Sequence, residues 1–186
     1  VEMIFGNPYK FAILVEPIQN WSDETFINGL VFYMVDGLML PFHDDGGVCN
    51  TTINSDLFAF KEQLTAWEKN PQNDEIFNMP KEKAFTELLL QVWPNEVDKS
   101  LIISDDFCEN YTHYLTSTMM QDSGSYCFLV GKGSVSRVLL GKWRRLVENT
   151  NGQSEWNKLE KPIINEVFLP HTELMEVFRL ALKEIA

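Results

Sequence analysis

The 186-residue sequence has few cysteines, no long hydrophobic run and no recognisable leader segment. Its three cysteines include no CxxC pair, so we expect buried thiols and no disulfide framework. The longest unbroken apolar run covers residues 30–35, far short of the ~20 residues that a membrane-spanning helix needs. No basic segment followed by an apolar stretch precedes the first strand, so no signal peptide is expected. We therefore expect a cytoplasmic protein whose natural start is Met3, with Val1 and Glu2 added in cloning.

Basic residues are scarce in the first two thirds of the chain. Residues 1–131 contain 20 acidic and only 6 basic residues, whereas residues 132–186 contain 7 acidic and 9 basic ones. No Lys or Arg occurs within residues 12–59 or within residues 100–131. This scarcity argues against general nucleic-acid binding, because affinity for a phosphate backbone comes largely from Lys and Arg. A long surface of one sign predicts a basic partner, although solubility alone would also explain the net charge of −12.

Apolar and aromatic residues, in contrast, are plentiful. They make up 45% and 12% of the chain, which is too much for a disordered protein and enough for a core without disulfide staples. A chain of this length folds most often as one domain. We therefore expect a single domain that covers residues 1–186.

The spacing of the apolar residues predicts an α+β fold, in which helices pack on one face of a mostly antiparallel sheet. Alternating or β-rich patterns predict strands at residues 3–6, 10–16, 29–35, 38–40, 101–103, 113–120, 125–130, 135–140 and 163–169. Apolar stripes at helical spacing predict helices at residues 54–69, 80–93 and 171–185. Polar composition predicts loops at residues 41–52, 70–79 and 149–160.

The sequence contains none of the motifs that mark common catalytic or metal sites. It has no HExxH pair, no Cys/His cluster with zinc spacing, no GxSxG elbow and no complete P-loop. One fragment, His43-Asp44-Asp45, resembles part of a metal or acid–base site, but a loop histidine beside two acids is more often simply solvated. We therefore predict no catalytic residue, no metal site and no cofactor. A small metal-assisted hydrolase built on these loop carboxylates is the alternative.

The first residues of the chain, MIFGNPYKFAI at positions 3–13, resemble a known family of proteins. The Asn-Gly-Leu segment at residues 28–30, the Asp-Gly-Leu turn at residues 36–38 and the Ala-Phe pair at residues 84–85 fit the same pattern. Together they resemble bacterial polymorphic-toxin immunity proteins, close to immunity protein family forty-two. The resemblance implies a cytoplasmic protein of contact-dependent growth inhibition, which binds the C-terminal toxin domain that a neighbouring cell delivers. Many of those toxins are nucleases with basic surfaces.

Charge and resemblance together predict an immunity protein that is not an enzyme and that neutralises a basic, nuclease-type toxin domain by occlusion. Acids in loops can reach a partner's Arg and Lys without disturbing the core. We predict that the toxin-binding residues are Asp44, Asp45, Asp105, Asp106, Glu109 and Tyr111. Trp93 is a further aromatic candidate, although its place after an apolar helical stripe favours the core. We expect no direct contact with nucleic acid or a membrane, and a generic acidic adaptor for another basic partner is a further alternative.

Overall fold

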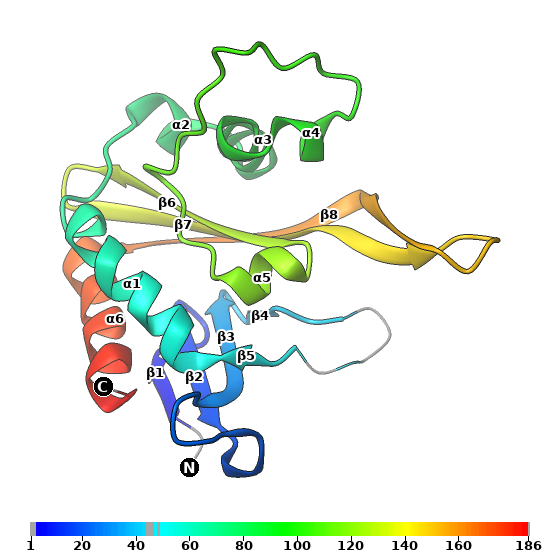
Figure 1. The fold of residues 1–186 in the computed structure, drawn as a ribbon. Coiled ribbons are helices and arrows are strands. Elements are labelled where there is room, and N and C mark those ends of the chain that lie inside the picture. The colour runs from blue at the N-terminus through cyan, green and yellow to red at the C-terminus, as the bar shows by residue number, and fades with distance from the viewer. Residues whose placement is uncertain (1–2, 44–46, 48, 186) are drawn as a thin grey trace.

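The computed structural model describes residues 3–43, 47 and 49–185, and in these residues the strands form two antiparallel sheets (Figure 1). The first sheet contains β1 (Met3–Gly6), β2 (Phe11–Pro17), β3 (Asn28–Val35), β4 (Leu38–Leu40) and β5 (Thr51–Thr52). Its strand order is β1-β2-β3-β4, and β5 also pairs with β3. A 3-10 turn, η1 (Gln19–Trp21), lies between β2 and β3.

Local sequence explains the hairpins of this sheet. In β2 and β3, Ile13 lies opposite Tyr33, and both side chains are fully buried. Asp36 and Gly37 connect β3 to β4 with φ angles of 48° and 77°. Glycine adopts this left-handed conformation without strain and aspartate tolerates it, so the hairpin turn predicted from the Asp-Gly pair is confirmed.

The second sheet consists of three long strands, β6 (Ser125–Lys132), β7 (Val135–Glu148) and β8 (Ser154–Pro170). β6 pairs with β7 only as far as Lys142, whereas β7 and β8 stay paired up to Glu148 and Ser154. The ends of β7 and β8 therefore form a two-stranded arm, which extends beyond the body of the molecule (Figure 1). The loop predicted at residues 149–160 is wrong from residue 154 onward. An arm with water on both faces does not show the apolar alternation that identifies a strand.

Three long helices confirm the helices predicted from apolar stripes: α1 (Ile53–Trp67), α3 (Lys81–Val92) and α6 (His171–Ile185). Three short helices are not predicted by the sequence: α2 (Asp74–Asn78), α4 (Pro94–Val97) and α5 (Thr118–Asp122). In α2 and α5 the preceding Asn73 and Ser117 accept a backbone hydrogen bond inside the helix, which favours even such short helices. These caps are visible in the sequence only when the helix that follows them is known.

The second sheet is buried on both faces and separates two hydrophobic cores. Leu129 and Val138 face α1, α6 and the first sheet, whereas Phe128 and Leu139 face α2 and α3. Burial on both faces explains why residues 127–130 of β6 and residues 138–140 of β7 are apolar without the polar alternation of a one-sided strand. The α+β class is thus confirmed. The structure divides the predicted sheet into two and places helices on both faces of the second one (Figure 1).

Two further predicted strands are wrong. Residues 101–103 have no β partner among the described residues and are exposed. Residues 113–120 make a single bridge, between Tyr114 and Phe128, before α5 begins. Residues 101–103 are aliphatic and residues 113–120 mix polar and apolar side chains, but neither segment lies beside a strand over enough residues to form a ladder. The expectation of buried thiols holds for Cys49 and Cys127 and is wrong for Cys108, which is exposed.

Candidate functional site

Residues 101–112 form an exposed acidic segment that arches over α3 and α4 (Figure 1). All of these residues are exposed, and the segment contains three acids and no Lys or Arg. Several large apolar side chains are exposed beside the acids: Leu101, Ile102, Ile103, Phe107 and Tyr111. Ile102 has 98% of its surface in water. A combined acidic and apolar surface of this kind is typical of a site where another protein binds.

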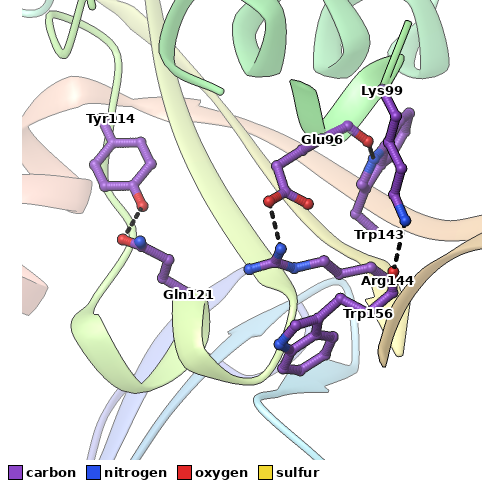
Figure 2. Close-up of polar contacts among 7 residues, drawn as sticks. All are labelled: Glu96, Lys99, Tyr114, Gln121, Trp143, Arg144 and Trp156. Carbon is purple, nitrogen blue, oxygen red and sulfur yellow. Dashed lines mark hydrogen bonds and ion pairs between the residues drawn. The ribbon is translucent and has the colours of Figure 1, made fainter. Parts of the chain in front are cut away.

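The N-terminal end of the exposed acidic segment is anchored by α4. Glu96 of α4 forms an ion pair with Arg144, and its carbonyl oxygen accepts a hydrogen bond of 2.8 Å from the indole nitrogen of Trp143 (Figure 2). Lys99, just after the helix, donates to the carbonyl oxygen of Trp156 at 3.2 Å. These contacts join the start of the segment to β7 and β8, which belong to the most extensively paired part of the fold.

A turn follows directly after this anchor. The Asp98 carboxylate accepts hydrogen bonds from the backbone N–H and the hydroxyl of Ser100, at 2.8 and 2.7 Å. Because these bonds favour the ionised form, they hold the pKa of Asp98 below its ordinary value. The turn directs the chain away from α4 and into the exposed acidic segment.

The C-terminal end of the segment is anchored by α3. The backbone N–H of Asn110 donates to the carbonyl oxygen of Gln91 at 2.9 Å, and its side-chain amide donates to the Gln91 side chain at 3.3 Å. The Asn110 side-chain oxygen also accepts from the Thr112 N–H at 3.0 Å. Both ends of the exposed acidic segment are thus fixed to the body of the protein, and between them the Phe107 N–H donates to the carbonyl oxygen of Ser104 at 3.0 Å.

Asn110→Ala is expected to loosen the exposed acidic segment without unfolding the protein. The substitution removes both side-chain hydrogen bonds of Asn110, which together contribute about 1–2 kcal/mol locally. We expect faster amide hydrogen exchange in residues 98–112, measured by mass spectrometry, and unchanged exchange in the two sheets. The control is Asn95→Ala, since the Asn95 side chain makes no hydrogen bond within the described part of the chain. Equal exchange in the two variants would show that Asn110 is not an anchor.

An aromatic cluster supports the same end of the segment. The Tyr111 ring lies edge-on against Trp93 and Tyr114, with ring centroids 6.4 and 5.3 Å away. The Tyr114 hydroxyl donates to Gln121 of α5 at 3.0 Å (Figure 2). Trp93 is half-buried against the second core, so the core interpretation of this residue is the better one. Tyr111 remains exposed at the surface.

Of the predicted site residues, the structure brings Glu109 and Tyr111 into direct contact. The Tyr111 hydroxyl donates to the Glu109 carboxylate at 2.8 Å. Burial, this hydrogen bond and the negative charge of Glu109 raise the pKa of Tyr111 to about 12. Asp105 and Asp106 belong to the same exposed acidic segment and have no ion pair or hydrogen bond within the described residues. Their charges are therefore available to a basic partner.

The other predicted pair, Asp44 and Asp45, lies outside the described residues. The chain leading to them is held by Lys142, whose ammonium group donates to the carbonyl oxygen of Phe42 at 2.9 Å and lies 5.1 Å from the centre of its ring. Among the described residues, no three His, Cys, Asp or Glu side chains cluster closely enough to hold a metal ion. The same part of the chain contains no helix that is long and apolar enough to span a membrane.

Comparison with known proteins identifies the family. The family described as Immunity protein 42 matches residues 3–184, nearly the whole chain. The chain belongs to this family. The protein therefore has a toxin-neutralising immunity function, and the resemblance seen in its first residues is confirmed.

A solved structure supports the same fold. The crystal structure of CdiI from Burkholderia dolosa AUO158 has a TM-score of 0.70 to this protein at 24% sequence identity. The match covers 98% of this chain and 99% of the CdiI chain. No curated protein matches the sequence.

Sequence reasoning located the acids of the exposed acidic segment but missed the apolar side chains beside them. The β-rich run at residues 101–103 favours a strand when only the sequence is considered. The signal that could have corrected this assignment is the composition on both sides. Charged and polar residues flank the aliphatic run, and no Gly or Pro stands beside it to form a turn that would pair it with another strand.

Proposed function

We propose that this member of the immunity protein 42 family acts in the cytoplasm in contact-dependent growth inhibition. In this proposal it binds the cognate C-terminal toxin domain through the exposed acidic segment and blocks a basic, nucleic-acid-binding surface of that domain. The similarity to a CdiI protein supports the contact-dependent system. The net charge of −12 supports a basic partner.

The observation that carries the proposal is the exposed acidic segment itself. Its aspartates lack partners within the described chain, its apolar side chains are exposed to water, and both of its ends are fixed to helices. A partner that covers it gains apolar burial and pairs these charges, and the fixed ends of the segment lower the ordering entropy that binding costs. Opposite potentials on the two proteins would also raise the association rate by about ten- to a thousandfold.

Occlusion explains neutralisation without chemistry. A nuclease needs basic side chains to hold the phosphate backbone of its substrate. Carboxylates that pair with those side chains remove the charge on which substrate binding depends. Asp44 and Asp45 remain part of the proposal as additional acids for the same basic surface.

Reversing both aspartates, Asp105→Lys with Asp106→Lys, is expected to weaken toxin binding by about 10- to 100-fold. Each exposed ion pair contributes about 0.2–1 kcal/mol, and reversal replaces attraction by repulsion. The measurement is the Kd for the toxin domain encoded next to this protein, together with rescue of growth in cells that express both. The association rate of the variant should also depend less on salt concentration.

The control reverses two acids elsewhere, Glu62→Lys with Glu176→Lys. Both residues are exposed, lie on α1 and α6, and have no partner within the described residues. The control carries the same change of net charge, so a general electrostatic effect would weaken toxin binding equally in both variants. Equal Kd values for the two double variants would exclude the exposed acidic segment as the toxin-binding surface.

A further inference from the structure

The two stretches of sequence that lack Lys and Arg meet in space and line one cavity. The cavity has a volume of about 550 Å³ and lies between the first turn of α1, β5 and α5. Its lining residues are Trp21, Asn28, Asn50, Thr51, Thr52, Ser55, Asp56, Thr118, Met119 and Asp122. Every one of them comes from residues 12–59 or residues 100–131. One concave site is therefore lined entirely by the two stretches that lack basic residues.

The lining of this cavity suits a cationic group. Two carboxylates, those of Asp56 and Asp122, are combined with amide and hydroxyl oxygens, and no lining residue is basic. Trp21 contributes an aromatic ring that is 44% exposed. Carboxylates accept hydrogen bonds from a guanidinium or ammonium group, and an indole ring attracts the same groups through its π face.

Asp56 gives the cavity a negative charge that is held in place. Asp56 is only 3% exposed, and its carboxylate accepts a hydrogen bond of 2.7 Å from the Thr51 hydroxyl. Burial raises the pKa of Asp56, and the negative charge of Asp122 acts in the same direction. Hydrogen bonds from Thr51 and Thr118 oppose this rise because they favour the ionised form. A cation between the two carboxylates would relieve their mutual repulsion.

We propose that this cavity receives a basic side chain of the toxin domain. Arginine fits better than lysine, because a planar guanidinium can stack on Trp21 while it donates to Asp122 and Asp56. The volume lies within the range of about 300–1,000 Å³ that is typical of pockets for small molecules, so one long side chain can enter. This inference rests on the proposed function. It gives the toxin domain a second point of contact, in addition to the exposed acidic segment.

Filling the cavity tests whether it is occupied in the complex. Ser55→Phe places a bulky neutral side chain at the cavity, on an exposed position in the first turn of α1. The variant keeps the net charge and both carboxylates, and it removes one lining hydroxyl, so its main effect is on the space in the cavity. We expect the Kd for the toxin domain to rise at least tenfold. The control is Ala66→Phe, an exposed position on the same helix outside the cavity lining, with a Kd within twofold of the unmodified protein.

Removing charge tests the chemistry of the cavity. Asp122 is exposed and is the last residue of α5, so Asp122→Asn should leave the fold intact. We expect this variant to raise the Kd about three- to tenfold. Asp122→Lys should raise the Kd further, because its ammonium group would take the place of the toxin's basic side chain and repel it. Glu62→Lys, at an exposed position on α1 outside the cavity, should leave the Kd within threefold.

The outcomes separate this inference from the proposed function. If the unmodified protein does not bind the toxin domain, the proposed function fails, and the cavity loses its partner with it. If binding occurs and weakens in the Asp105→Lys/Asp106→Lys variant, the proposed function stands. Unchanged binding in both Ser55→Phe and Asp122→Asn would then overturn the cavity inference alone.

Discussion

Phe178→Ala is expected to lower the free energy of unfolding by about 3–5 kcal/mol, the range typical of large-to-small changes in a core. The Phe178 side chain is fully buried on α6. Its ring lies within 5.1 to 6.3 Å, between centroids, of the rings of Phe11, Tyr33, Phe60 and Trp67. These rings come from β2, β3 and α1, so one substitution weakens contacts among four elements of the first core.

The measurement is urea unfolding, in which the midpoint should fall while the slope of the transition stays constant. A loss of 3–5 kcal/mol is a large part of the ~5–15 kcal/mol that a domain of ordinary stability possesses. Phe58→Ala is the matched control, because Phe58 lies on α1 but is 64% exposed. It should cost less than about 1 kcal/mol. Similar losses in both variants would mean that the aromatic cluster does not hold α6 against the sheet.

Glu166→Ala is expected to cost about 3 kcal/mol, because it leaves a buried guanidinium without its negative partner. Arg137 is 1% exposed, and its Nε donates to the Glu166 carboxylate at 2.7 Å. Its Nη1 donates to the carbonyl oxygens of Ile76 and Phe77, at 2.9 and 3.0 Å, and its Nη2 lies 2.5 Å from the same Glu166 carboxylate. Arg137 thereby ties α2 to β7 and β8. The expected loss is at the lower end of values for buried pairs, since the Glu166 side chain is 28% exposed.

An exposed ion pair provides the comparison. Glu68 and Arg179 form a salt bridge of 2.9 Å with both side chains almost half exposed. Glu68→Ala should cost less than about 1 kcal/mol, because water already solvates both charges. Thermal or urea unfolding of both variants measures the difference. A loss for Glu166→Ala no larger than that for Glu68→Ala would show that Arg137 finds other compensation in the folded protein.

Local sequence was sufficient for much of the secondary structure. The three long helices follow from apolar stripes at helical spacing, and the Asp36-Gly37 turn follows from the backbone freedom of its residues. These features depend on neighbours within a few positions of the chain, so they can be read without tertiary contacts. The α+β class follows in the same way from the mixture of helices and hairpins.

Elements whose stability comes from distant partners were assigned wrongly. Residues 101–103 look like a strand but have no β partner in the described chain, whereas the mostly polar residues 154–158 are part of a strand because β7 pairs with them. Whether an aliphatic run is buried, or a polar run is paired, depends on what lies beside it in space. Single-sequence patterns carry no such information.

The acidic character of the protein and the family resemblance were determined by the sequence alone, because charge and motif are properties of the chain itself. The arrangement of that charge was not. Folding exposed Asp105 and Asp106 beside apolar side chains, and it brought residues 12–59 and 100–131 together around one cavity. Chain connectivity fixes neither event. The first depends on how α3 and α4 hold the ends of the exposed acidic segment, and the second depends on how α1, β5 and α5 lie beside one another.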